Sequence, residues 1–160
     1  MVAKLIQIAE ESLNQPEVIA LLEAGNVYMA QLYPAESNHL LDVASLCKPE
    51  VTFLVARIDG RVVGCGAIVA SSEGWWAEIK RMFVSPAARG NNIGRLLLQK
   101  LQAAAAERGI GVLRLETGIK QPEALSLYRS TGFVEIGPFA DYRPDELSVF
   151  MEKPLLPRPG

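Results

Sequence analysis

The chain has 160 residues, of which 49% are hydrophobic and 21% are charged, a balance typical of one globular domain with a buried core. A formal net charge of −2 gives no electrostatic footprint for a nucleic acid, and no apolar run approaches the ~18 residues of a membrane span. We see no secretory signal at the N-terminus. We therefore expect a cytoplasmic protein that binds neither nucleic acid nor membrane.

The first third of the chain predicts one strand followed by helix. Apolar residues alternate over residues 2–9, which favours an edge strand. Pro16 is typical of a helix start, and apolar residues at helical spacing extend the helix to about residue 31, with an interruption near Gly25. Residues 40–46 are predicted to add one or two helical turns.

The rest of the chain interleaves strands and helices. Residues 51–58 and 62–69 are apolar strands joined by Asp59-Gly60, a sequence that favours a tight hairpin turn. The elements predicted after them are a strand at 76–84, a helix at 93–105, a strand at 112–116, a helix at 122–130, and strands at 133–136 and 147–152. This order predicts an α/β (α+β) fold, a mixed sheet with helices on both faces.

The domain limits follow from the C-terminal prolines. Pro154, Pro157 and Pro159 form a tail that cannot pair into a sheet. We therefore expect one domain over residues 1–154 and a Pro-rich tail over 155–160.

Metal and disulfide chemistry are not indicated. Cys47 and Cys65 lack Cys-x-x-Cys spacing and are expected to be reduced, buried thiols. His39 is the single histidine and cannot assemble a zinc site with two scattered cysteines. No metal is therefore expected.

The most informative segment runs from Ser85 to Leu98, where an apolar strand enters a turn rich in Gly and Asn that opens directly into a helix. Such a turn leaves backbone N–H groups without partners at the positive end of the helix, which suits a diphosphate. A Walker loop would need Gly-Lys-Ser or Gly-Lys-Thr, which is absent, and the glycine spacing differs from that of a dinucleotide fold.

The loop resembles the acetyl-CoA pyrophosphate loop of the GNAT superfamily of N-acetyltransferases, written Gln/Arg-x-x-Gly-x-Gly/Ala. Arg89, Ile93 and Gly94 fit it, whereas Asn92 stands where the central Gly is usual. Asn tolerates the left-handed backbone conformation, so the loop shape is expected to survive. Residues 77–86 resemble the strand that leads into this loop, and residues 124–133 resemble the family segment A-x-x-L-Y-x-x-x-G-F.

The resemblance implies a mostly antiparallel sheet that is splayed open between two parallel strands, with the acyl arm of acetyl-CoA in the splay. It implies that the backbone of Met82, Phe83 and Val84 pairs with the pantetheine amides. The loop and helix start then bind the phosphates, through Arg89, Gly90, Asn91, Asn92, Ile93, Gly94 and Arg95.

Glu78 and Tyr128 are the candidate catalytic residues. An alkylamine must lose a proton before it attacks a thioester, and a carboxylate can accept that proton directly or through water. Glu78 aligns with the glutamate that some family members use as base; otherwise it is a solvated strand acid or a salt-bridge partner of Lys80 or Arg81. Tyr128 aligns with the tyrosine that donates a proton to the departing CoA thiolate; otherwise it is a half-buried helix aromatic.

The acceptor pocket is expected near residues 28–42, where Tyr33, Glu36 and Ser37 offer an aromatic and polar groups. An ordinary surface loop is the other interpretation. Trp75 and Trp76 either line the same cleft or pack the sheet.

The sequence therefore predicts an acetyl-CoA-dependent N-acetyltransferase in which a bound amine attacks the thioester directly. Cys65 is the one remote candidate for a covalent nucleophile. A non-catalytic acyl-CoA-binding module is the alternative, and the acceptor is a small-molecule amine or a peptide. A homodimer is left open.

Overall fold

The computed structural model describes residues 4–35 and 43–155. The elements in chain order are β1 (Ile6–Glu10), α1 (Pro16–Leu32), η2 (Ser45–Cys47), β2 (Val51–Ile58), β3 (Arg61–Ala70), β4 (Trp76–Val84), η3 (Pro86–Ala88), α2 (Ile93–Glu107), β5 (Val112–Gly118), α3 (Pro122–Ser130), β6 (Val134–Ile136) and β7 (Ser148–Pro154). The described strands form one seven-stranded sheet in the order β1-β2-β3-β4-β5-β7-β6. The expected mixed sheet is confirmed.

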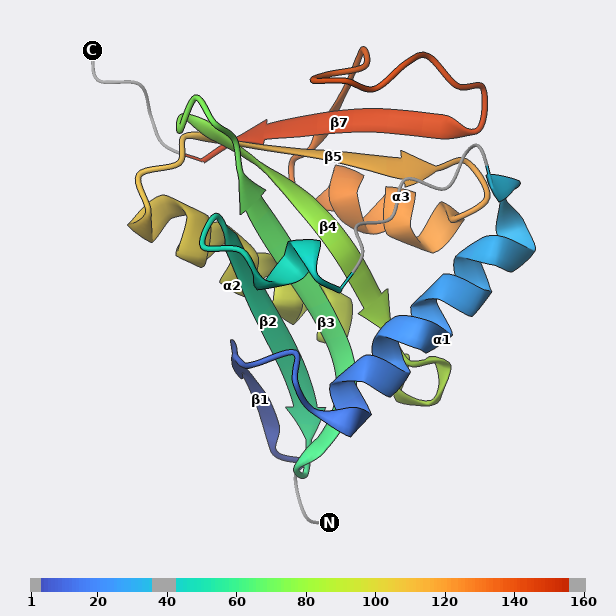
Figure 1. The fold of residues 1–160 in the computed structure, drawn as a ribbon. Helices are drawn as coiled ribbons and strands as arrows, with labels where there is room; N and C mark the ends of the chain where they lie inside the picture. The colour runs from blue at the N-terminus through green and yellow to red at the C-terminus, as the bar shows by residue number, and fades with distance from the viewer. Residues whose placement is uncertain (1–3, 36–42, 156–160) are drawn as a thin grey trace.

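The sheet is antiparallel except between β4 and β5, which run parallel. Their pairing begins at Trp76↔Val112 and ends at Ile79↔Leu115. Beyond that point β4 keeps its pairing with β3 only, and β5 keeps its pairing with β7 only. In Figure 1 the two strands start together and then diverge, with α3 behind the opening. The implied splay is confirmed.

Helices cover both faces of the sheet because the strand residues alternate between two cores. One core packs α2 and α3 against β2–β5, through residues such as Ile68, Leu97 and Leu113. The other packs α1 against the opposite face of β2 and β3, through residues such as Val18 and Val55. Figure 1 shows α1 in front of the sheet with α2 and α3 behind it.

Several boundaries differ from the expected ones. The helix does not break near Gly25 but continues from Pro16 to Leu32. Gly25 is buried there, and a Cβ on it would lie 3.4 Å from the ring of Phe83, so the glycine serves close packing rather than a turn. The turn at Asp59-Gly60 is confirmed, with φ of 49° and 84°.

Three further differences concern short segments. The turns expected at 40–46 fall partly outside the described residues, and a 3₁₀ turn forms at Ser45–Cys47. Pro154 is not tail but the last residue of β7, paired with Val112, because a strand end tolerates a missing N–H. Cys47 is exposed rather than buried. No helix of the described chain is both long and apolar enough to cross a membrane.

Candidate functional site

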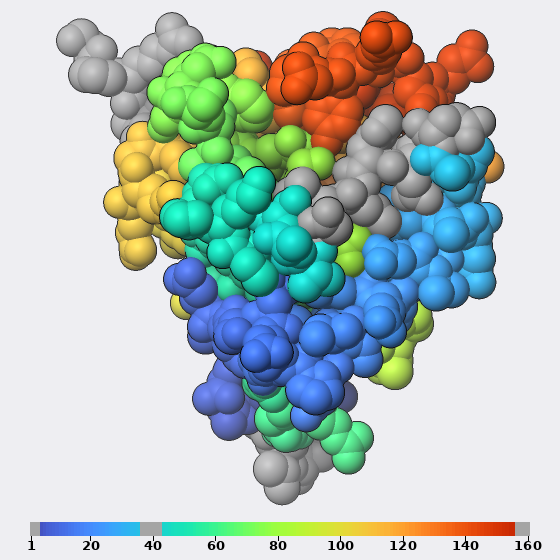
Figure 2. All heavy atoms as spheres, viewed as in Figure 1, coloured from blue at the N-terminus to red at the C-terminus, as the bar shows by residue number. Residues whose placement is uncertain are grey.

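A cleft of about 780 Å³ occupies the splay between β4 and β5. Its walls come from α1, the open part of β4, the start of α2, the end of β5 and α3. In the space-filling view, atoms of the β4 region lie recessed between α1 and the C-terminal part of the chain (Figure 2). The cleft therefore exists because the two parallel strands part after four residue pairs.

The loop before α2 has the backbone geometry that an anion site needs. Asn92 is the N-cap residue with φ 63° and ψ 23°, and its side chain makes no capping hydrogen bond. Gly90 has φ +88° and open space where a Cβ would point. The first helical hydrogen bond runs from Leu96 N to Asn92 O, 3.1 Å. The N–H groups of residues 93–95 therefore have no acceptor within the helix. These residues form the end of α2 that lines the cleft.

Of the charged and polar side chains in and next to this loop, two arginines line the cleft and Asn91 does not. Arg89 and Arg95 line the cleft. The Arg89 guanidinium lies 3.9 Å from the Glu123 carboxylate of α3, and Arg95 donates to the Ser130 hydroxyl at 3.0 Å. Asn91 is not in the cleft wall, because its amide donates to Ala88 O and its oxygen accepts from Lys4.

The open part of β4 supplies the second expected element. Met82, Phe83 and Val84 line the cleft, and Phe83 and Val84 pair with β3 on one edge only. Their other edge faces the splay, where the parallel pairing with β5 has already ended. This leaves backbone groups available to an extended ligand that adds to the sheet edge.

Glu78 belongs to a compact polar cluster on β4. Its Oε2 accepts a short hydrogen bond from the Tyr142 hydroxyl and lies 3.3 Å from Lys80 Nζ. Lys80 Nζ also donates to the Tyr142 hydroxyl at 2.7 Å. Burial, together with the Glu78 charge, raises the pKa of Tyr142, so this phenol stays neutral. The cleft thus brings Glu78 together with Lys80, one of the salt-bridge partners considered for it, and with Tyr142, which the sequence did not indicate.

Glu116 is a second carboxylate in the same cleft that sequence reasoning missed. It is the first β5 residue after the last β4–β5 pair, and one of its oxygens accepts from the Ser148 hydroxyl at 2.8 Å. Burial raises the pKa of Glu116 to about 7, and the nearby charges of Lys80 and Glu78 act in opposite directions. Its only sequence signal was an acid at the end of a strand that leads to the helix of Tyr128.

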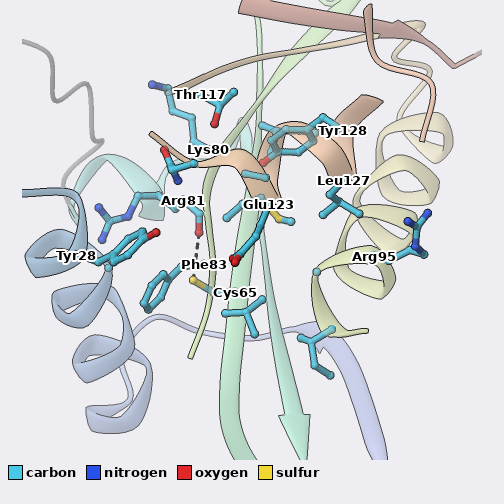
Figure 3. A pocket seen from close by; sticks show the side chains of 18 of the residues that line it. Tyr28, Cys65, Lys80, Arg81, Phe83, Arg95, Thr117, Glu123, Leu127 and Tyr128 are labelled. Atoms are coloured by element: carbon cyan, nitrogen blue, oxygen red, sulfur yellow. Dashed lines mark hydrogen bonds between the residues drawn. The ribbon is translucent and has the colours of Figure 1, made fainter. Parts of the chain in front are cut away.

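Tyr128 stands on the α3 wall of the cleft and is 6% exposed. Its ring packs edge-on against Phe133, with centroids 5.6 Å apart. Burial raises the pKa of Tyr128, so the phenol keeps its proton at neutral pH. Figure 3 shows its hydroxyl pointing from α3 toward the middle of the cleft. The geometry thus places a neutral proton donor opposite β4.

Only one of the three residues expected at the acceptor side, Tyr33, is among the residues that the structure describes. Glu36 and Ser37 lie outside the described residues. Tyr33 is buried beside the cleft rather than in its wall. Its hydroxyl donates to Gln121 Oε1 at 3.2 Å and accepts from Lys120 N at 3.2 Å. Tyr33 therefore anchors the end of α1 to the β5–α3 loop. Trp75 and Trp76 pack around the Arg114 guanidinium at 4.9 Å and do not line the cleft.

Cys65 does not suit a covalent nucleophile. It is fully buried, and its thiol donates to Arg81 O at 3.2 Å. Burial raises the pKa of Cys65 to about 12, which leaves almost no thiolate at neutral pH.

The cleft as a whole fits acetyl-CoA. The uncapped helix start suits the diphosphate, the free β4 edge suits the amides of the pantetheine arm, and the titratable groups gather where that arm would end. An added Cβ on Gly94 would lie 3.3 Å from Leu127, so a glycine lets α2 start close to α3.

Comparisons with known proteins agree with this geometry. The family model described as "Acetyltransferase (GNAT) family" matches residues 19–133. The chain is 53% identical over 150 residues to "IAA acetyltransferase" of Azospirillum brasilense, covering 94% of this chain and 98% of that protein. It is 35% identical to "Uncharacterized N-acetyltransferase YsnE" of Bacillus subtilis, covering 94% of this chain and all of that protein (100%).

A solved structure supports the same assignment. The putative acyl-CoA N-acyltransferase of Klebsiella pneumoniae superposes with a TM-score of 0.83 at 40% identity, covering 94% of this chain and 98% of that one. The non-catalytic alternative is therefore set aside. The chain belongs to the GNAT family and is an acetyl-CoA-dependent N-acetyltransferase.

Proposed function

We propose that this enzyme acetylates the primary amine of a small cationic molecule, which it deprotonates with the two carboxylates that line the cleft where the strands separate. The observation that carries the proposal is the pair Glu78 and Glu116, which line one cleft on either side of the strand separation. Two acids at one end of a cleft attract an ammonium group and provide a base for its proton.

Each further residue then has a role set by its position. The N–H groups at the start of α2, with Arg89, Gly90, Asn92 and Arg95, hold the diphosphate. The Met82–Val84 edge pairs with the pantetheine arm, and a backbone N–H there polarises the acetyl carbonyl. Acetyl-CoA supplies the activated acetyl group.

Proton transfer is divided between the two walls. Glu78, held by Lys80 and Tyr142, or its neighbour Glu116, takes the ammonium proton directly or through water. Tyr128 donates a proton as the thiolate leaves. Attack is direct, because the buried Cys65 thiol is not ionised.

Other features stay predictions. We take residues 1–154 as one domain, Glu36 and Ser37 as acceptor-side groups, and Tyr33 as a support for that side. The cytoplasmic location and the homodimer also stay predictions.

The test is a thiol-release assay with acetyl-CoA and a panel of acceptors at pH 8. The panel contains polyamines, aminoglycosides, amino acids, a lysine peptide and, because of the Azospirillum relative's name, indole-3-acetic acid. Turnover is expected with a cationic amine. Turnover confined to the anionic indole acid, which carries no aliphatic amine, would overturn the proposal.

A further inference from the structure

Arg81 occupies a strained position in the middle of β4. Its φ is +60°, in the left-handed region that favours glycine and that a long side chain occupies only when its surroundings enforce it. The register explains the location: Cys65 pairs with Phe83 and Ala67 with Lys80, so Arg81 and Met82 together oppose Gly66. This is a β-bulge, which bends the strand and turns the residues after it.

The bulge is held from the β3 side by a thiol. Cys65 Sγ donates to Arg81 O at 3.2 Å, the contact drawn as a dashed line in Figure 3. A Cβ on Gly66 would lie 2.7 Å from Met82 Sδ, so the glycine makes room for the inward-turned Met82. These contacts fix where β4 bends but involve no charge.

The Arg81 guanidinium holds the bulge from the other side. It donates to the Asn26 side-chain oxygen and, at 3.1 Å, to Leu22 O, both on α1. Figure 3 shows this side chain reaching from β4 toward the α1 ribbon. Both partners are neutral, and burial lowers the pKa of Arg81, so the arginine occupies a costly environment. A half-buried cation that is bonded only to neutral groups and sits in a strained backbone indicates a role in positioning the strand.

We propose that Arg81 is a positioning residue that clamps the β4 bulge to α1 and thereby aims a backbone N–H of the 82–84 segment at the acetyl carbonyl, an inference that rests on the proposed function of that edge. The same clamp joins the α1 wall to the cofactor edge. Phe83 follows the bulge, and its ring lies over Gly25 and beside Tyr28, with centroids 6.0 Å apart.

Two substitutions separate the clamp from the backbone strain. Arg81→Gly keeps the left-handed conformation, which glycine adopts freely, but deletes the guanidinium. Arg81→Lys keeps the charge but lacks the planar fork that reaches two acceptors. Asn26→Ala removes one exposed partner and leaves Arg81 in place. Glu23→Ala, also exposed on α1, is the matched control.

The readout is the infrared carbonyl stretch of bound [1-¹³C]acetyl-CoA, which needs no acceptor, with cofactor affinity measured by calorimetry. In the wild type we expect a shift to lower frequency from the polarising N–H. Arg81→Gly should lose most of that shift at nearly unchanged CoA affinity, with a fall in turnover on the order of 10- to 100-fold. Arg81→Lys and Asn26→Ala should lose part of it, and Glu23→Ala none.

The outcomes separate the two levels of inference. A wild-type protein that binds acetyl-CoA without a frequency shift refutes the proposed β4 contact itself. A normal shift in both the wild type and Arg81→Gly refutes only the clamp. If Arg81→Gly does not fold, Asn26→Ala decides: a shift equal to that of Glu23→Ala overturns the clamp.

Discussion

The two halves of the β4–β5 pair differ in chemistry as sharply as in geometry. In the closed half, from Trp76 to Ile79 and from Val112 to Leu115, the strands are bonded together and Leu113 is fully buried. In the open half, Lys80 and Glu116 follow directly, and together with Glu78 from the end of the closed half they line the cleft with titratable groups. One strand pair thus provides both buried support and one wall of the cleft. The point at which the strands separate determines which residues are buried between them and which are open to a ligand.

The largest expected effect tests the chemistry of the cleft through Glu78, which is paired with Arg114 in the closed half but whose side chain lines the cleft. Glu78→Gln keeps an acceptor for the Tyr142 hydroxyl but loses the base, so turnover should fall by about 10²- to 10⁴-fold with little change in melting temperature. The deficit should shrink as pH approaches the pKa of the acceptor amine. A pH–rate profile checks this, with the exposed Glu10→Gln as control.

Tyr128→Phe is the companion change on the opposite wall. It should lower kcat more than acetyl-CoA affinity, because in the proposed reaction the phenol acts only when the thiolate leaves. Water replaces part of its role, so we expect a smaller loss than in Glu78→Gln. Wild-type turnover in both variants would remove the two residues from catalysis.

The fully buried side chains of the closed half should respond in stability instead. Leu113→Ala deletes a fully buried side chain, which costs about 2–5 kcal/mol of unfolding free energy. Turnover per folded molecule should stay near that of the wild type. Chemical denaturation and activity at low temperature measure the two effects; a loss of kcat equal to that of Glu78→Gln would abolish the contrast between the halves.

Glu116 should link the open half to pH. Its pKa of about 7 lies above the ordinary 4.5, so the folded state binds the proton more tightly than the unfolded state does. This contribution to stability is present below pH 4.5 and is lost as pH rises through about 7. At 1.36 kcal/mol per pKa unit, the loss approaches about 3 kcal/mol.

The variant that isolates this effect is Glu116→Gln. Its unfolding free energy, compared with that of the wild type, should rise between pH 5 and pH 8. The exposed Glu135→Gln should show no such trend. Parallel pH dependence of Glu116→Gln and the wild type would mean that Glu116 is ionised throughout.

The smallest effect concerns the helix start. Gly90→Val places a β-branched side chain at φ +88° beside the phosphate site and should weaken CoA binding by roughly tenfold. Gly74→Val is the matched control, since Gly74 has φ +83°, similar open space and no place in the cleft. Calorimetry should show weaker binding only in the first; equal affinities would place the phosphates elsewhere.

The sequence predicted most of the fold and only part of the cleft. Local patterns sufficed for the Asp59-Gly60 turn and for the loop before α2, because turn and cap residues act within a few positions. The salt bridge between Glu78 and Lys80 was considered because the two residues alternate on one strand, but Tyr142 was not predicted beside them, because it is 64 positions from Glu78 and meets it only in the folded chain. The helix break predicted at Gly25 was wrong because this glycine makes room for the Phe83 ring. That contact joins residues far apart in the sequence and cannot be read from the local pattern.

The contact between Tyr33 and Gly118 has a consequence for protein engineering. A Cβ at position 118 would lie 1.8 Å from the Tyr33 hydroxyl oxygen, so any side chain there requires Tyr33 to move and to give up its hydrogen bonds to Gln121 and Lys120. The two positions are 85 apart in the sequence, but a substitution at one restricts which residue is accepted at the other. A library that diversifies the end of β5 should therefore vary residue 33 together with residue 118, so that a smaller residue at 33 makes room for each side chain at 118.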